Sequence, residues 1–289
     1  MPTAGDSQAP DGDEQFPRTK DLPRQSPLYW VNQKDRYLRQ LMIRDIESLT
    51  GRRLIVYFAN RFLEGSDIDD GDPSMITELL SDIKDGEPVD FMIETNGGKT
   101  DSTEAIVSIL QNRITDLRVV VANAAKSNGT LICLAASSIV MGPTSELGPI
   151  DPHIQGTPCT ILALPDMAAM NFPLHHMALL FLKQTQKLAE NLLRKGMMKQ
   201  AAPGEVERVV QALSTRDTYF SHGSTIDLRE AAQLGLNVEA LDTNDEIWNR
   251  IWLLYSMYDF DSRRDCMLKI FEGRARSTSI KGNLPNGVV

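Results

Sequence analysis

The sequence predicts an α/β protein built on a parallel β-sheet with flanking helices and a helical C-terminal extension. Short apolar runs of strand length alternate with longer segments of helical periodicity between residues 34 and 255. This alternation is typical of strand–helix–strand units with right-handed crossovers. The run from Leu54 to Phe58 is continuously apolar, as expected of a strand that is buried on both faces. With 289 residues and 42% hydrophobic content, the chain can form one large domain or two small ones.

The first half of the chain shows clear start and stop signals. Residues 34–50 carry apolar side chains at helical spacing and are followed by Gly51, which predicts a helix and its end. Asp72-Pro73 is a typical helix start. The expected strands are 54–58, 89–93, 119–122 and 139–141, and the expected intervening helices are 73–83, 101–114 and 130–136.

The second half is expected to be mainly helical. The expected elements are helices over 174–199, 203–213, 227–235 and 243–255, with a last strand at 238–241. The final helix is apolar on more than one face, which suits a subunit interface as well as a core. We expect residues 1–33 to form a disordered or extended arm, residues 34–258 the folded domain, and residues 259–289 a polar tail.

Composition excludes several classes of function. A net charge of −9 argues against nucleic-acid binding, which needs clustered Lys and Arg. The three cysteines lie far apart without a CxxC pair, so neither a disulfide framework nor a zinc site is expected. No apolar stretch reaches the length of a membrane span. We therefore expect a soluble cytoplasmic protein that uses no metal and no cofactor.

Two turns carry the residues that point to chemistry. The strand ending near residue 93 runs into Asn96-Gly97-Gly98, and the strand ending near residue 122 runs towards Ser127. In parallel sheets, ligands bind beyond the carboxyl ends of the strands, where both turns fall. Glycines expose backbone N–H groups, and a hydroxyl beside preorganised donors is the minimum equipment for acyl transfer. The alternative role for Ser127 is that of a helix N-cap.

In this order of segments the chain resembles the Clp protease–crotonase superfamily and, in detail, the serine dehydrogenase proteinase family of Clp-fold serine proteinases. The resemblance covers roughly residues 35–255 and implies a Clp/crotonase-like fold. The matching segments are Glu94-Thr-Asn-Gly-Gly98, Ala125-Lys-Ser-Asn-Gly-Thr130, Ile139-Val-Met-Gly-Pro143, Leu147-Gly-Pro-Ile-Asp-Pro152, Ser221-His-Gly223 and Glu230-Ala-Ala-Gln-Leu-Gly-Leu236.

The resemblance implies a role for particular residues. Ser127 takes the place of the nucleophile, and the backbone N–H groups of Gly98 or Gly97 and of Asn128 would form the oxyanion hole. Two departures affect the pocket without removing a donor. Asn96 stands where relatives have proline, and Asn128 stands where a small residue is common.

The general base is left open among three histidines. The position of His153 matches the Clp-type histidine, and Arg216-Asp217 matches the context of the orienting aspartate. His176 lies near the position where related Ser–Lys peptidases carry a lysine. His222 lies five residues from Asp217 in one loop, which suits an orienting pair or a structural role.

Two charged residues, Lys126 and Asp151, are not expected to take part in catalysis. Lys126 precedes the serine, and successive side chains of an extended segment point apart, so we expect it to face solvent or pair with a carboxylate. Asp151 lies in a proline-rich turn and is expected to form that turn.

The function that follows is a serine peptidase-like hydrolase that cleaves peptide or protein substrates as a homo-oligomer. Two alternatives remain. A crotonase-like acyl-thioester enzyme would use the same two N–H groups without the serine, and a non-catalytic Clp-fold scaffold would bind peptides or a partner.

Overall fold

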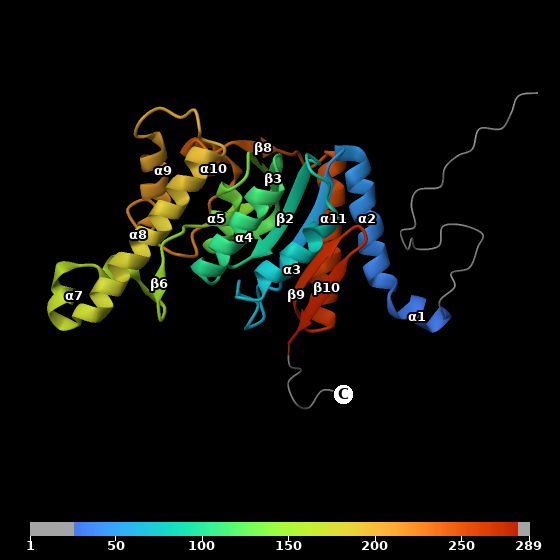
Figure 1. Cartoon of the computed structure of the whole chain (residues 1–289), viewed down its shortest axis with the longest axis horizontal. Helices are drawn as coiled ribbons and strands as arrows, with labels where there is room; N and C mark the ends of the chain where they lie inside the picture. The colour runs from blue at the N-terminus through green and yellow to red at the C-terminus, as the bar shows by residue number, and fades with distance from the viewer. Residues whose placement is uncertain (1–25, 283–289) are drawn as a thin grey trace, which may run out of the picture.

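In the computed structural model, which describes residues 26–282, an eight-stranded sheet runs through the centre of the protein (Figure 1). The strand order is β10-β9-β1-β2-β3-β4-β8, and β5 pairs with β3. The strands are β1 (Arg53–Ala59), β2 (Val89–Thr95), β3 (Leu117–Ala125), β4 (Ser138–Met141), β5 (Glu146–Leu147), β8 (Val238–Ala240), β9 (Met267–Gly273) and β10 (Ser277–Lys281). A separate two-stranded hairpin consists of β6 (His153–Ile154) and β7 (Thr157–Pro158).

The helices connect and cover these strands. They are α1 (Pro27–Asn32), α2 (Lys34–Thr50), α3 (Asp72–Leu79), α4 (Thr100–Arg113), α5 (Asn128–Leu134), α6 (Cys159–Leu162), α7 (Pro165–Met170), α8 (Phe172–Lys195), α9 (Glu205–Ser214), α10 (Leu228–Leu234) and α11 (Glu246–Arg264), with a 3-10 turn η1 (Leu80–Asp82). None of the helices in the described part of the chain is long and apolar enough to span a membrane.

The central strands β1, β2, β3, β4 and β8 are parallel, as predicted. The expectation of a polar tail after residue 259 is wrong, because α11 continues to Arg264 and β9 and β10 then extend the sheet. β9 lies antiparallel to β1, and β10 antiparallel to β9. The predicted N-terminal arm lies mostly outside the described residues, although α1 is helical within it.

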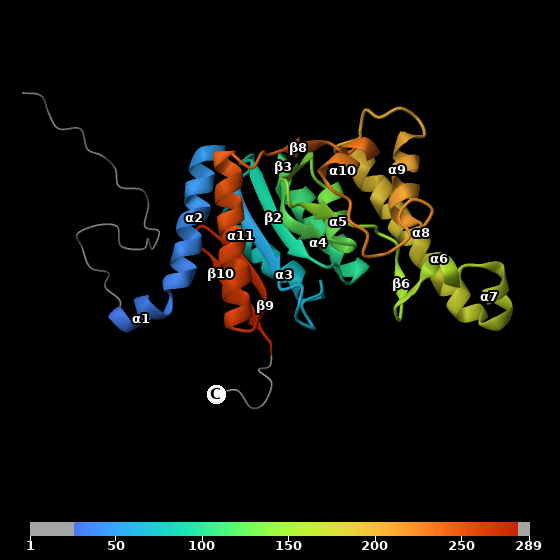
Figure 2. The ribbon, with the colours of Figure 1, turned by 180° about the vertical axis from the view of Figure 1, so that it is seen from behind.

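Two hydrophobic layers hold the sheet between helices. On one face, α2 and α11 lie side by side and pack on the sheet, as both views show (Figure 2). The buried residues of this layer include Ile43, Ile46, Trp248, Leu254 and Tyr258. The larger layer on the other face includes residues of α3, α4, α5, α8, α9 and α10. The final helix is therefore part of the core as well as partly exposed.

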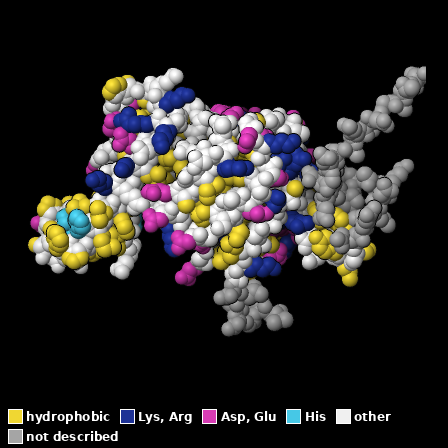
Figure 3. Space-filling model, in the orientation of Figure 1, with side chains coloured by type: hydrophobic (Ala, Val, Ile, Leu, Met, Phe, Trp, Pro, Cys, Tyr) yellow, Lys and Arg dark blue, Asp and Glu magenta, His cyan; other side chains and the backbone are white. Residues whose placement is uncertain are grey.

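The α6–α7 segment and the start of α8 project from the body of the protein, and hydrophobic side chains gather on this projection (Figure 3). A small core of its own, built on Cys159, Leu162 and Ala178, holds the projection together. Several of its larger apolar side chains are exposed, including Leu164, Met170, Phe172 and Met177.

Candidate active site

The turns that follow β2 and β3 lie against each other. The N–H of Lys126 donates to the carbonyl of Thr95 over 3.0 Å, which continues the pairing of the two strands to their ends. A Cβ added to Gly97 would lie 2.8 Å from the Cβ of Ser127 and 3.0 Å from the backbone N of Asn128. No larger residue fits between them, so glycine at this position lets the two turns come into direct contact.

Ser127 adopts an unusual backbone conformation. Its φ of 51° and ψ of −119° are rarely adopted by residues other than glycine. The residue stands at the N-cap position of α5, but its side chain makes no capping hydrogen bond. The N-cap interpretation of the serine is therefore not what the structure shows, and its hydroxyl is left available at a sharp strand-to-helix turn. The same arrangement presents nucleophilic serines elsewhere.

Two backbone donors beside Ser127 have no acceptor. Within residues 26–282, neither the N–H of Gly98 nor that of Asn128 donates a hydrogen bond. The side-chain amide of Asn128 is turned away from this pair, since it donates to the carbonyl of Gly98 and to Thr100 Oγ1. Asn128 thus braces the glycine turn from the side. An anionic oxygen near Ser127 would find two unused donors.

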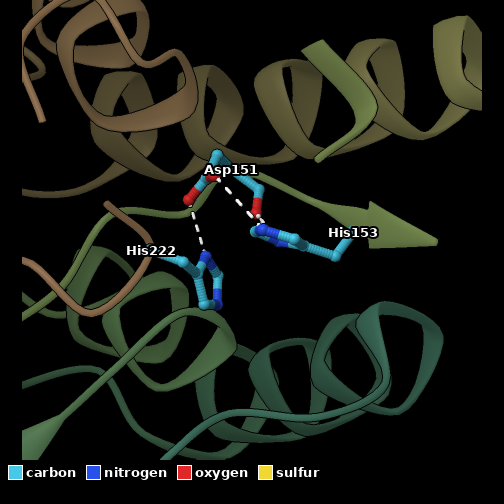
Figure 4. A group of neighbouring side chains, drawn as sticks. All are labelled: Asp151, His153 and His222. Carbon is cyan, nitrogen blue, oxygen red and sulfur yellow. Dashed lines mark hydrogen bonds and ion pairs between the residues drawn. The ribbon is translucent and has the colours of Figure 1, made fainter. Parts of the chain in front are cut away.

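Asp151 is the centre of a hydrogen-bonded cluster with two histidines (Figure 4). Its side chain is only 2% exposed. Its Oδ1 lies 2.6 Å from Nδ1 of His222, and its Oδ2 lies 3.1 Å from Nε of Arg216. The backbone carbonyl of the same residue lies 3.0 Å from Nδ1 of His153. One buried residue therefore orients two imidazoles, whose ring centres are 4.2 Å apart.

The partners fix the roles of the ring nitrogens. Arg216 can only donate, so Nε2 of His153, 3.0 Å from its Nη2, must accept, and Nδ1 of His153 carries the proton. Burial lowers the pKa of His153, and the neighbouring His222 lowers it further. In His222, Nδ1–H donates to the carboxylate of Asp151, which leaves Nε2 with its lone pair and without a partner among the described residues. Of the two rings, His222 is the one with a free basic nitrogen.

Ser127, Gly98, Asn128 and His222 line one cleft of about 880 Å³. Asp151 and His153 also reach this cleft, as do Phe181 and Gln184 of α8. The structure thus brings together Ser127, the predicted donors Gly98 and Asn128, and two of the three candidate bases. The N–H of Gly97, the alternative donor, instead donates to Thr95 Oγ1 over 3.0 Å.

The loops that carry these groups are tied to one another. Lys126 is buried, with its Nζ 2.9 Å from Glu146 and 3.0 Å from the carbonyl of Leu147. Burial lowers the pKa of this lysine. Leu147 in turn exchanges two backbone hydrogen bonds with Ile226, a short distance after His222. Of the two expectations for Lys126, the carboxylate pair is confirmed and exposure to solvent is wrong.

Two predicted site residues lie elsewhere. His176 is exposed on the projection and stacks on Phe172, with ring centres 6.0 Å apart. The carboxylate of Asp217 is exposed and bonds to Gln211 and Thr215 rather than to a histidine. Neither residue lines the cleft around Ser127. The histidines are oriented by Asp151, which the sequence had indicated only as a turn former.

Sequence reasoning also missed Arg216 as the partner of Asp151. The available signal was that Asp151 belongs to the segment 147–152, one of those that carry the family resemblance. A second signal was Arg216, which precedes Asp217 in the sequence and whose guanidinium matches a carboxylate in geometry. Neither signal predicts that the loop of Asp151 contacts the loop of Arg216.

The cluster of Asp151, His153 and His222 also has the composition of a metal site, with one ligand atom of each residue within 4.8 Å of the others. Arg216, however, donates to His153 Nε2 and to Asp151 Oδ2. Its guanidinium therefore already supplies positive charge to two members of this cluster.

Residues 32–263 match the family model of ClpP-like SDH-type serine proteinases. Two proteins of Methanocaldococcus jannaschii are similar in sequence. Uncharacterized protein MJ0137 is 29% identical over 179 residues, which cover 60% of this chain and 59% of that protein. Uncharacterized protein MJ1495 is 37% identical over 67 residues, 23% of each chain.

The chain therefore spans about three fifths of the length of the first of these relatives. Among solved structures, a ClpP1 point mutant from Listeria monocytogenes is similar with a TM-score of 0.42 and 14% sequence identity. The match covers 70% of this chain and 98% of that one.

Proposed function

Because the chain belongs to the family of ClpP-like SDH-type serine proteinases, we propose that it is a serine peptidase whose nucleophile is Ser127. His222 is the general base in this proposal, and Asp151 orients it. The observation that carries the proposal is the contact of Asp151 Oδ1 with His222 Nδ1, in the same cleft as a serine that caps no helix.

The mechanism follows the logic of a Ser–His–Asp triad. Nε2 of His222 takes the proton of the Ser127 hydroxyl as Oγ attacks the peptide carbonyl. The imidazolium that forms is stabilised by the buried carboxylate of Asp151, which is itself held by Arg216. His222 then returns the proton to the leaving amine. In the second half of the reaction, His222 takes a proton from the water that attacks the acyl-enzyme and returns it to Ser127 Oγ.

The free N–H groups of Gly98 and Asn128 bind the oxygen on which negative charge develops. Such donors act mainly in the transition state, and removal of one typically costs about 3 kcal/mol of its stabilisation. The short β6–β7 hairpin with His153 forms a neighbouring part of the cleft, and His153 holds the cluster in place rather than accepting the proton.

A fluorophosphonate probe tests this proposal, because it reacts far faster with an activated serine beside an oxyanion hole than with an ordinary serine. The purified full-length protein is expected to be labelled at Ser127, and Ser127→Ala is expected to abolish labelling. Ser137→Ala is a matched control, since this serine donates to the carbonyl of Leu117, away from the cleft.

Labelling that survives Ser127→Ala would refute the assignment of the nucleophile. No labelling of the wild-type protein, together with binding of peptides, would favour a Clp-fold scaffold. Binding of a coenzyme A thioester without labelling would favour the crotonase-like alternative, which needs the two N–H groups but not the hydroxyl.

A further inference from the structure

The glycine turn is clamped by a segment that takes no part in the proposed chemistry. The N–H of Ile68 donates to the carbonyl of Gly97 over 2.8 Å, and the N–H of Lys99 donates to the carbonyl of Ile68 over 2.9 Å. A Cβ on Gly98 would lie only 2.4 Å from the backbone N and O of Ile68. Because the contact leaves no free space, a displacement of Ile68 displaces Gly98.

The segment after Ile68 is held by the carboxylate of Asp72. The N–H of Asp69 donates to Oδ2 of Asp72 over 3.0 Å, and the hydroxyl of Tyr57 donates to the same oxygen over 2.9 Å. Asp72 is fully buried at the start of α3. A buried carboxylate needs a positive partner, since an isolated one is strongly destabilising.

Lys269 supplies that partner. Its side chain is 1% exposed, and its Nζ lies 2.7 Å from Asp69 Oδ2 and 2.8 Å from Asp72 Oδ1. The lysine belongs to β9, which pairs with β1 at the edge of the parallel strands. Residue 269 also lies beyond residues 32–263, the part of the chain that matches the family. No step of the proposed mechanism uses this ammonium group.

We propose that Lys269 is a positioning residue that fixes the direction of the Gly98 N–H. It acts through Asp69 and Asp72, which hold Ile68 against the glycine turn. The catalytic consequence rests on the proposed function, because it assumes that the Gly98 N–H binds an oxyanion. The structural consequence, a fixed Gly98, does not rest on it.

The sequence offers a direct probe of Gly98. Gly97-Gly98 is the only pair of adjacent glycines among the 289 residues. Protein labelled with glycine that carries 13C in its carbonyl and 15N in its amide therefore gives one signal in a carbonyl-to-amide NMR experiment, that of the Gly98 amide. This signal reports the environment of the proposed donor without any need for activity.

A matched control is available on the same strand. Glu272 of β9 is buried and pairs with Arg39 of α2, with Nε 2.8 Å from Oε2. The hydroxyl of Tyr258 of α11 donates to Glu272, and neither residue of this pair forms a hydrogen bond or ion pair with residues 66–72. The test compares Lys269→Met/Asp72→Asn with Arg39→Met/Glu272→Gln. Each double variant removes one buried ion pair of β9 and, with the cation, a second ion pair, that of Lys269 with Asp69 or that of Arg39 with Asp261.

The proposal expects Lys269→Met/Asp72→Asn to shift the Gly98 amide signal and to lower kcat about 100-fold, with KM changed less than about three-fold. The control pair is expected to lose stability but to keep the wild-type Gly98 signal and kcat. If both variants leave the Gly98 signal unchanged, or both move it equally, Lys269 is not a positioning residue.

A milder variant covers the case in which the double variant does not fold. Asp69→Asn removes one ion pair of Lys269 at a side chain that is 45% exposed, and it is expected to shift the Gly98 signal by a smaller amount. An unchanged signal would overturn the proposal. A protein without peptidase activity whose Gly98 signal still depends on Lys269 would refute the proposed function and leave the positional role standing.

Discussion

Nδ1 of His222 lies 2.6 Å from Oδ1 of Asp151, and this contact joins two loops that are 71 residues apart in the sequence. The carboxylate holds the imidazole in the tautomer that keeps Nε2 unprotonated. In the proposed mechanism, a buried group thereby sets the direction of the general base, and the first two predictions test this relationship.

Asp151→Asn is expected to lower kcat by about 10⁴-fold, because the amide can stabilise the wrong tautomer of His222 and cannot stabilise its protonated form. Steady-state kinetics with a fluorogenic peptide measure the effect. The control is Asp217→Asn, which alters an exposed carboxylate bonded to Gln211 and Thr215 and is expected to change kcat less than about two-fold. Equal effects of the two variants would contradict the role of Asp151.

His222→Ala is expected to slow fluorophosphonate labelling by about 10³-fold, the usual contribution of a general base. His153→Ala is expected to slow it less than about ten-fold, because Nε2 of His153 is occupied by Arg216. His176→Ala, on the exposed projection, serves as the control and is expected to have no effect. A larger loss in His153→Ala than in His222→Ala would make His153 the base.

Gly97→Ala is expected to lower the free energy of unfolding by about 2–4 kcal/mol. Roughly 1 kcal/mol comes from its positive φ of 104° and the rest from a Cβ placed 2.8 Å from that of Ser127. Gly86→Ala is the matched control, since Gly86 also has a positive φ, of 80°, but has no atom within 4 Å of an added Cβ. Urea denaturation should show a loss of only about 1 kcal/mol for Gly86→Ala. Equal losses would show that the two turns are not in contact.

Glu94 is expected to make stability depend on pH between about 4.5 and 7. Burial raises the pKa of this carboxyl from 4.5 to about 7, although the N–H of Ala124, Asn123 and Arg61 oppose the shift. Its stabilising contribution is fully present below pH 4.5 and is lost as pH rises to about 7, with an amplitude of order 3 kcal/mol. The measurement is the difference in unfolding free energy between wild type and Glu94→Gln across this range. If the unfolding free energies of wild type and Glu94→Gln change in parallel with pH, the raised pKa of Glu94 is contradicted.

Peptides with a lysine or arginine near the scissile bond are expected to be cleaved faster than peptides with glutamate there. Asp67 and Asp101 line the cleft and form no ion pair within residues 26–282, whereas Asp70 is neutralised by Lys99. Asp67→Asn/Asp101→Asn should reduce the preference roughly two- to five-fold, and added salt should reduce it in the wild type. Asp166→Asn on α7 serves as the control. If neither the double substitution nor added salt reduces the preference for basic peptides, Asp67 and Asp101 do not cause it.

Local patterns were sufficient to predict the centre of this fold. The strands β1 to β4 each contain a short, mainly apolar run, and the turns at Gly97 and Ser127 follow from glycine and from the ends of those runs. These features are readable because each depends on residues that are close in sequence. The position of Ser127 beside the glycine turn then follows from the parallel order of neighbouring strands.

The features that were missed depend on distant contacts between charged groups. The strand β9 contains Lys269 and Glu272, and a sequence reading takes such charges as marks of an exposed tail. Both are buried because Asp72 and Arg39, some 200 residues earlier, neutralise them. Asp151 was misread for the same reason, since nothing in its own loop shows that Arg216 and His222 approach it.

The backbone of Ser127 couples the hydroxyl to a local steric cost. At φ 51°, glycine adopts this turn without the cost that a Cβ brings. A mutation to glycine would therefore remove the hydroxyl and the steric cost together, whereas a mutation to alanine would remove the hydroxyl and keep the cost.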